Sequence, residues 1–261
     1  MQKEIIKFSP SVVFEGMTSI RAILSGNDAG INDRKIEKIL YDKSKYSKNA
    51  KNIGYLKAVS EKYGFTVCAT DAEELDKMTL GTSHGGIIAV ANERNIPPLE
   101  SSTPLPNIGF FAMIQGIEDP YNFGYALRSL YALGIDGIIL PKRNWMSAAG
   151  VVCRSSAGAS ELFNMYICDN PTDAAKIFKS HNYSIVCAEE KTNNVLGECL
   201  LPLPILLIVG GEKRGISQEL LQVSDTLVKI DYNRSFNASL SAASATTIFA
   251  YEIMRQNKKI K

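Results

Sequence analysis

One stretch of the chain decides its fold class: Pro204-Ile-Leu-Leu-Ile-Val-Gly-Gly-Glu-Lys-Arg-Gly-Ile-Ser217. It begins with a continuous apolar run, which is typical of a strand buried on both faces of a parallel sheet. Two glycines follow directly, and glycine lets a backbone approach a ligand closely. Because ligands of open α/β sheets bind at the carboxyl ends of strands, the stretch predicts an α/β domain with a binding loop here.

Similar apolar runs alternate with helical patterns throughout the C-terminal part of the chain. They predict strands over residues 108–114, 137–140, 183–188, 204–209 and 226–230, and helices over residues 121–133 and 238–255. Such alternation indicates a sheet covered on both faces. The earlier part repeats it more weakly, with strands over residues 36–41, 65–69 and 86–91 and helices over residues 50–63 and 72–78. There we expect a smaller, mostly parallel sheet, with residues 65–69 as a buried strand.

A proline-rich segment separates these two parts. Asn95-Ile-Pro-Pro-Leu-Glu-Ser-Ser-Thr-Pro-Leu-Pro-Asn107 contains four of the ten prolines. Proline lacks the backbone donor and resists both helix and central strand, so the segment predicts an extended linker. The expected organisation is a domain over residues 1–95, a linker over residues 96–107 and a second domain over residues 108–261.

Composition excludes several classes of protein. The chain is 45% hydrophobic and 21% charged, as in ordinary globular proteins. Its apolar runs are too short to span a membrane, and its first residues do not resemble a signal peptide, so we expect a cytoplasmic location. The five cysteines and two histidines are scattered, which predicts neither a disulfide framework nor a metal site.

Positive charge is concentrated in one short segment, although the whole chain has a formal charge of only +2. Residues 34–57 contain eight basic and two acidic side chains, a net +6. Such a segment can neutralise phosphates, although a solvated lysine-rich face is as good an interpretation of charge alone. The candidate nucleic-acid contact residues of this segment are Arg34, Lys35, Lys43, Lys45, Lys48 and Lys51.

Two further segments follow predicted strands. Asp119-Pro-Tyr-Asn-Phe-Gly124 leads into a helix containing Arg128, and we expect Asn122 in the loop before that helix. Ser235-Phe-Asn237 precedes the last helix, where serine and asparagine could also be simple helix caps. The segment with Gly210 and Gly211 matches neither a dinucleotide fingerprint nor a P-loop, and the sequence contains no such fingerprint elsewhere. This disfavours a dinucleotide-dependent oxidoreductase.

Together the three segments, in this order, resemble the SpoU/TrmH family of SPOUT methyltransferases. Arg154-Ser-Ser-Ala-Gly-Ala-Ser-Glu161 is similar to the family's connecting segment, and the first 95 residues resemble its substrate-binding module. The resemblance implies an S-adenosylmethionine-dependent RNA ribose 2′-O-methyltransferase. It also implies a C-terminal domain with a deep trefoil knot, and a homodimer with its active sites near the subunit interface.

The resemblance assigns roles to residues whose positions match the motifs. As catalytic residues it implies Asn122, Arg128, Glu212, Ser235 and Asn237, and as cofactor-binding residues Gly210, Gly211, Ile230 and Phe236. Phe236 stands where the family usually has leucine. A guanidinium is a poor base, so we expect Arg128 to pair with phosphate and polarise the hydroxyl rather than remove its proton.

Three substrate and activity alternatives remain at this point. A separate N-terminal module favours large-subunit ribosomal RNA over transfer RNA, and guanosine is the commonest base in the family. A resistance-type ribosomal RNA methyltransferase fits the same motifs. A non-catalytic knotted RNA-binding protein is disfavoured because Asn122, Arg128 and Glu212 are all present.

Overall fold

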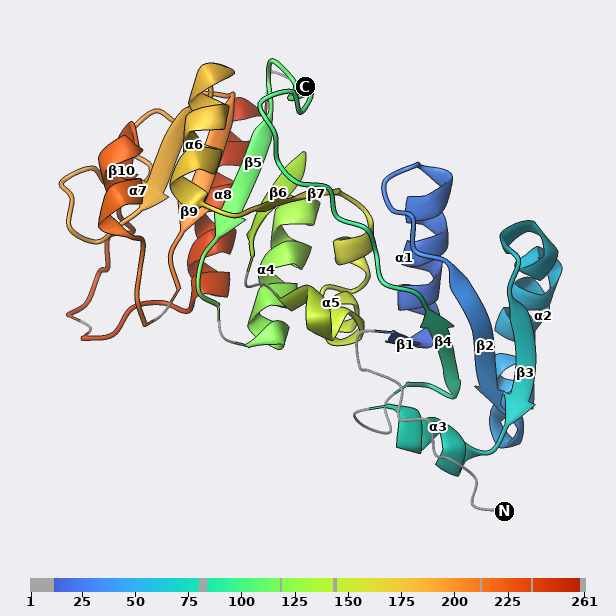
Figure 1. The fold of residues 1–261 in the computed structure, drawn as a ribbon. Coiled ribbons are helices and arrows are strands. Elements are labelled where there is room, and N and C mark those ends of the chain that lie inside the picture. Colours follow the sequence, from blue (N-terminus) through green and yellow to red (C-terminus); the bar gives the residue numbers. More distant parts are fainter. Residues whose placement is uncertain are drawn as a thin grey trace. The chain divides into compact units, whose positions relative to one another are not determined.

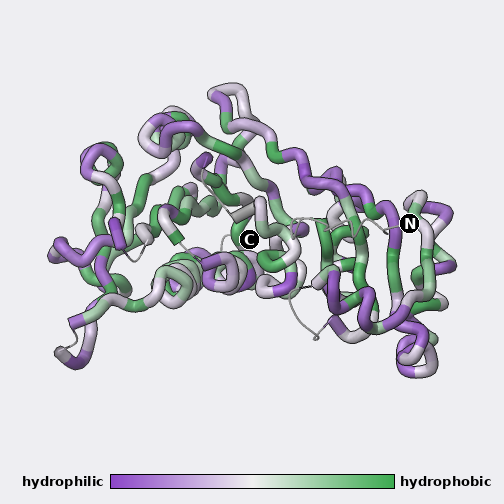
Figure 2. Tube along the Cα trace, turned by 60° about the horizontal axis from the view of Figure 1, so that its bottom comes forward, coloured by the Kyte–Doolittle hydropathy of each residue, from purple (hydrophilic) through white to green (hydrophobic). Residues whose placement is uncertain are grey.

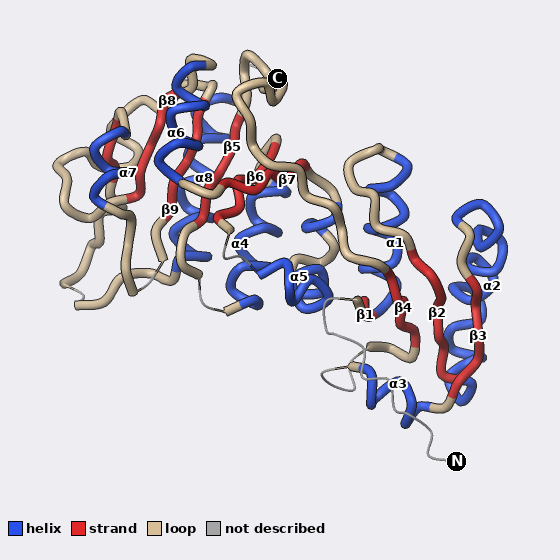
Figure 3. The backbone as a smooth tube through the Cα atoms, in the orientation of Figure 1, coloured by secondary structure: helices blue, strands red, loops and turns tan. Residues whose placement is uncertain are grey.

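The computed structural model describes residues 12–79, 84–117, 119–142, 145–211, 213–235 and 237–258. The chain divides into two compact units (Figures 1 and 3). Unit 1 comprises Met1–Asn95 and Trp145–Leu162, and unit 2 comprises Ile96–Asn144 and Phe163–Lys261. The chain therefore passes between the units three times. It enters unit 2 after residue 95, returns to unit 1 for residues 145–162, and then enters unit 2 again. The boundaries of independently folding domains stay a prediction.

The sheet of unit 1 is mixed, so the expectation of a mostly parallel sheet was wrong. Its strands, in the order β1-β4-β2-β3, are β1 (Val13–Glu15), β4 (Ile87–Ala91), β2 (Ile36–Asp42) and β3 (Thr66–Thr70). Strand β4 runs antiparallel to both β1 and β2, and β3 runs parallel to β2. Strand β4 lies between β2 and the three-residue β1, and the apolar pattern did not reveal β1.

Four helices of the described residues, from two segments of the chain, belong to unit 1. They are α1 (Gly16–Asp28), α2 (Tyr46–Tyr63), α3 (Ala72–Met78) and α5 (Ala149–Ser155), with short 3₁₀ turns at Lys43–Lys45, Trp145–Ala148 and Ala159–Glu161. The main core joins Phe14, Ile20, Ile39 and Ile53 to Cys153 from the distant segment. Strand β3 is largely exposed rather than buried, because within the described residues it is an edge strand paired only with β2.

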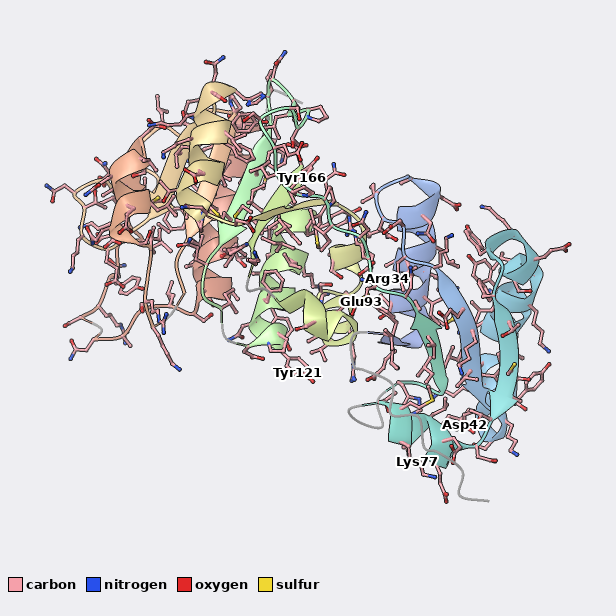
Figure 4. All side chains as sticks on the ribbon, in the orientation of Figure 1. Arg34, Asp42, Lys77, Glu93, Tyr121 and Tyr166 are labelled. Carbon is pink, nitrogen blue, oxygen red and sulfur yellow. The ribbon has the colours of Figure 1, made fainter. Side chains whose placement is uncertain are left out.

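A buried ion pair joins the distant segment to the rest of unit 1. The Arg34 Nε atom lies 3.0 Å from the Glu161 Oε2 atom, and both side chains are at most 1% exposed. The guanidinium also donates to the Asn92 carbonyl at 2.6 Å and lies over the Phe14 ring. Figure 4 shows Arg34 just before β2. A side chain with these partners has no surface to offer RNA, so the prediction of Arg34 as an RNA contact was wrong.

Unit 2 contains the parallel sheet that the apolar runs predicted. Within the residues that the structure describes, the sheet has six strands in the order β10-β8-β9-β5-β6-β7, and every neighbouring pair is parallel. They are β5 (Phe110–Ile114), β6 (Gly137–Pro141), β7 (Asn164–Cys168), β8 (Ser184–Ala188), β9 (Ile205–Val209) and β10 (Thr226–Val228).

Helices cover both faces of this sheet. On one face α6 (Pro171–Ser180) and α7 (Gln218–Val223) pack Phe178 and Leu220 against Phe111 and Ile208 of the strands. On the other, α4 (Pro120–Ala132) and α8 (Ala242–Asn257) pack against each other and the sheet (Figure 1). Figure 2 shows the strands as mainly hydrophobic segments and the connecting loops as mainly hydrophilic ones. Both layers are therefore held by apolar burial.

The predicted linker lies on unit 2 as an extended segment. The Leu99 amide donates to the Ile167 carbonyl at 2.8 Å, and the Ile167 amide donates to the Pro97 carbonyl at 2.9 Å. The segment thus pairs with the outer edge of β7, and its Leu105 packs against the core. Proline at an edge is compatible with such pairing, because its missing donor faces away from the sheet.

The cysteines behave as core or surface residues. Cys153, Cys168 and Cys187 are buried, and burial raises the pKa of Cys153 and Cys187 to about 12 and that of Cys168 to about 11. A thiol with so high a pKa is a weak nucleophile. In the described part of the chain no cluster of three or more His, Cys, Asp or Glu side chains could hold a metal, and no helix there is long and apolar enough to span a membrane.

Candidate active site and cofactor pocket

The three motif segments leave the same edge of the six-stranded sheet. The first follows β5, the second follows β9 and the third follows β10. Strands β5 and β9 are direct neighbours, in a register that pairs Ile114 with Val209. Strand β10 is separated from β9 by β8 alone. Because all these strands are parallel, their carboxyl ends bring the three segments together, as the strand-end rule predicts.

The first and second segments touch through glycine backbone. The Gln115 amide donates to the Val209 carbonyl at 2.9 Å, which continues the pairing of the two strands beyond their ends. A Cβ atom added to Gly211 would lie 2.3 Å from the Gly116 carbonyl oxygen, and Gly116 itself has φ of +66°. Glycine is required at Gly116 by its left-handed backbone and at Gly211 by this close approach.

A hollow of about 230 Å³ opens beside these glycines. Its lining includes the backbone of Gly210 and Gly211, together with Ile230 and the apolar Phe249 of α8. A second, more open hollow adjoins it and includes Asn237. The two share five lining residues, which are Glu190, Lys229, Ile230, Tyr232 and Ser239. The structure therefore gathers Gly210, Gly211, Ile230 and Asn237, four of the residues predicted from sequence.

The third segment is a loop, because α8 begins four residues later than predicted. Ser241 caps α8 by accepting from the Ser244 amide at 3.2 Å, so Ser235 and Asn237 are not the helix cap. The Tyr232 hydroxyl accepts a hydrogen bond from the Leu240 amide at 3.1 Å and so closes the loop across its base. Ser235 and Asn237 are both exposed on the closed loop.

Helix α4 holds the two first-motif residues. Asp119 caps the helix by accepting from the Tyr121 amide at 3.0 Å, and Pro120 occupies the first position, where its missing donor costs nothing. Asn122 therefore lies in the first turn of the helix and is half-buried, rather than in the preceding loop as predicted. Arg128 is exposed nearly two turns further on. Figure 4 shows Tyr121 at the beginning of α4.

Two of the predicted site residues lie outside the described part of the chain, and some lining residues were not predicted. Glu212 and Phe236 lie outside the described residues. Glu189 and Glu190 line the hollow but belong to none of the three motifs. They come directly after β8, so the rule that ligands bind at strand ends could have found them.

The basic segment of unit 1 is divided by the structure. Lys35, Lys43, Lys48 and Lys51 are exposed and Lys45 is half-buried. Two of these lysines have acidic partners, since Lys43 lies 2.9 Å from Asp71 and Lys45 lies 3.6 Å from Asp42. The Lys43–Asp71 pair is exposed on both sides and contributes little to stability, whereas Asp42 is buried. Both pairs lower the local positive potential.

Comparison with known proteins identifies the fold and the family. The model of the SpoU rRNA Methylase family matches residues 109–251, more than half of the chain. The 23S rRNA (guanosine-2′-O-)-methyltransferase RlmB of Shewanella oneidensis is 29% identical over 202 residues, which are 75% of this chain and 80% of RlmB. RlmB of Photorhabdus laumondii is 26% identical, with 75% and 81% of the two chains covered.

Solved structures with the same fold include two with low sequence identity. The SpoU methyltransferase AviRb from Streptomyces viridochromogenes, in complex with AdoMet, has a TM-score of 0.75 at 19% identity, covering 94% of this chain and 90% of AviRb. An rRNA methyltransferase from Sinorhizobium meliloti has a TM-score of 0.73 at 20% identity, covering 94% and 86%. The likeness extends over both units. With its three motifs at one sheet edge and the family model matched over residues 109–251, the chain belongs to the SpoU rRNA methylase family, as the motifs predicted.

Proposed function

We propose that this protein transfers a methyl group from S-adenosylmethionine to a ribose 2′-hydroxyl of large-subunit ribosomal RNA, at a guanosine. The observation that carries the proposal is the family match over residues 109–251, whose motif segments meet beside one hollow. The relatives named 23S rRNA (guanosine-2′-O-)-methyltransferase favour ribosomal RNA and guanosine over transfer RNA. With ribosomal RNA as substrate, the cytoplasm stays our predicted location.

The hollow fits the cofactor in its chemistry. Backbone of Gly210 and Gly211 and the apolar side chains of Ile230 and Phe249 suit a flat adenine ring. Glu189 and Glu190 lie at the same hollow and suit a ligand with positive charge, such as the ammonium and sulfonium groups of S-adenosylmethionine. When bound, this cofactor supplies a methyl group that is already activated for transfer.

The protein's own residues have to align the ribose and neutralise its phosphates. Alignment of reacting groups alone can account for much of a rate enhancement. In the proposal Asn122 and Asn237 hold the target nucleotide, and Arg128 pairs with phosphate and polarises the 2′-hydroxyl. Arg128 has the planar, permanently charged group that such pairing needs. Glu212 and Ser235 order the site.

Arg128 gives the sharpest test of this division of roles. We expect Arg128→Ala to lower kcat by about 100-fold or more, because it removes a charge aimed at the reacting group. Arg128→Lys keeps the charge but loses the planar fork, so we expect intermediate activity. The S-adenosylmethionine dissociation constant, measured by calorimetry, stays within about twofold in both variants, because Arg128 is outside the hollow. Near-full turnover of Arg128→Lys contradicts the need for a bidentate phosphate contact.

The assay uses tritiated S-adenosylmethionine with ribosomal and transfer RNA from a strain lacking the gene. Label in ribosomal RNA, at one phosphodiester resistant to alkali, is the expected result. Label in transfer RNA instead would show that the protein is a transfer RNA methyltransferase, the alternative substrate class. Absence of label together with absence of cofactor binding contradicts the enzyme and favours the non-catalytic RNA-binding alternative.

The C-terminal part of unit 2 supports the proposed trefoil knot. The segment between β8 and β9 bonds to the chain on both sides of the third motif. The Leu196 amide donates to the Lys229 carbonyl at 2.8 Å, and the Asn257 side chain donates to the Leu201 carbonyl at 2.8 Å. We infer that residues 229–257 pass through this segment.

Helices α4 and α8 carry the face that we assign to the homodimer. Tyr121, Tyr125 and Arg128 lie on one exposed side of α4, and Ile248 and Tyr251 lie on one exposed side of α8. The two helices pack against each other. Exposed aromatic side chains that gather on neighbouring helices are typical of protein interfaces. An interface on this side of α4 would include Arg128 as well.

We therefore expect the double variant Tyr125→Glu/Tyr251→Glu to be a monomer, because burying two unpaired carboxylates opposes association. Light scattering after size-exclusion chromatography measures the mass. Leu200→Glu, which changes another exposed apolar residue of unit 2, is the control and remains a dimer. A dimeric double variant would place the interface elsewhere.

A further inference from the structure

Helix α2 has one buried and one basic side. Asn49, Ile53 and Leu56, spaced at i, i+4 and i+7, are buried against unit 1. Lys48, Lys51 and Tyr55, spaced at i, i+3 and i+7, are exposed and lie together on another side. Neither lysine forms an ion pair with any described residue, in contrast to Lys43 and Lys45.

Helix α1 adds a third cation to this side. The guanidinium carbon of Arg21 lies over the Tyr55 ring, 5.6 Å from its centroid, and Arg21 donates to the Asn52 side chain at 3.4 Å. These contacts hold Arg21 beside the ring, which is still 40% exposed. The result is an aromatic surface bordered by Arg21, Lys48 and Lys51.

The glycine next to Tyr55 is not required by the fold. Gly54 lies inside α2 and is exposed, and a Cβ atom added there would meet nothing within 4 Å. Glycine inside a helix is destabilising relative to alanine, so an open position is a poor place for it on stability grounds. Gly54 lies about 60° around the helix from Lys51, on the side away from Tyr55. It leaves this border of the surface without a side chain, which allows a ligand to approach the helix closely.

We propose that Arg21, Lys48, Lys51, Gly54 and Tyr55, here called the α2 face, bind an unpaired nucleotide of the substrate RNA. The exposed base stacks on Tyr55, and the flanking phosphates pair with Lys48 and Lys51. Unpaired bases stack on aromatic rings and guanidinium planes, whereas a duplex offers its phosphates but keeps its bases stacked inside. The inference rests on the proposed RNA substrate and names the part of that RNA recognised by unit 1.

The test compares two RNAs on the full-length protein by fluorescence anisotropy. One is a hairpin with an unpaired loop, and the other is a fully paired duplex of equal length. Loss of one base stack reduces affinity by about 5-fold to 150-fold. We therefore expect Tyr55→Ala to weaken hairpin binding by about tenfold or more and leave duplex binding within about twofold, while Tyr55→Phe keeps both.

Helix α2 offers matched controls. Tyr46 is 48% exposed and lies about 180° away around the helix, so Tyr46→Ala should leave hairpin binding unchanged. Lys48→Gln and Lys51→Gln should each lower the salt dependence of binding by about one phosphate contact. Lys57→Gln, an exposed lysine about 120° from Lys51, should not.

Unchanged hairpin affinity in Tyr55→Ala, or an equal loss in Tyr46→Ala, would overturn the proposal. Equal losses for hairpin and duplex would overturn it too, because they indicate contact with the backbone alone. Binding is measured without the cofactor, so failure of methyl transfer is a separate result. A protein that methylates no RNA but loses hairpin binding in Tyr55→Ala keeps the α2 face and loses the proposed activity.

Discussion

Replacing Gly211 with alanine is expected to weaken S-adenosylmethionine binding by about 10-fold to 100-fold, because overpacking costs about 1–3 kcal/mol where neighbours cannot yield. The added Cβ atom would lie 2.3 Å from the Gly116 carbonyl oxygen and 2.8 Å from that of Gln115. All these atoms are backbone, so no side chain can rotate to make room. The turns of the first and second motifs must separate, and that movement changes the wall of the hollow.

Isothermal titration with S-adenosylmethionine measures this effect directly. The control is Gly54→Ala, which adds the same methyl group in open space on α2 of unit 1. It should leave cofactor affinity unchanged. Wild-type affinity in Gly211→Ala would show that the contact between Gly116 and Gly211 does not shape the cofactor site. The circular dichroism of the variant should match that of the wild type, which separates a local change from unfolding.

Replacing Glu161 with glutamine should strongly destabilise unit 1. It leaves the Arg34 charge buried without its carboxylate, and breaking a buried pair from one side typically costs about 3–5 kcal/mol. The Asn32 side chain would still donate to the residue 161 carbonyl at 2.8 Å, so the backbone contact is retained. The loss would therefore report the ion pair itself.

Urea unfolding followed by the fluorescence of Trp145, the single tryptophan of the chain and part of unit 1, measures the loss. Asp28→Asn removes a carboxylate from the exposed pair with Lys62 and should leave the transition close to wild type. The double variant Arg34→Met/Glu161→Gln should recover part of the loss, since the buried Arg34 charge is removed together with its partner. A double variant no more stable than Glu161→Gln would count against this explanation.

The local elements were largely predictable, because their signals are local. Residues 72–78 form the predicted helix, and the apolar runs around residues 110, 138, 185 and 205 form strands. Signals that depend on partners far along the chain were not. The three-residue β1 has too few residues to show a period, and β3 has the apolar composition of a buried strand but lies at an edge.

The residues of the candidate site, too, were predictable only where their signals are local. The second motif could be placed from sequence because a strand followed by two glycines puts backbone at a strand end. Glu189 and Glu190 were missed because no family motif includes them, although they line the same hollow. Tyr232 lies in the third segment but was given no role. Among the basic residues, charge alone could not separate the buried Arg34 from the exposed Lys51.

By itself the sequence determined the family, the parallel sheet and the glycines at its carboxyl edge, because these depend on apolar periodicity and on residues close together in the chain. Only the tertiary structure decided which residues share a surface. It placed residues 145–162 in unit 1 and paired Arg34 with Glu161, which is 127 residues away in the sequence. It also set Arg21 against Tyr55. Such pairings depend on how two helices or strands are packed, and a linear pattern does not contain that information.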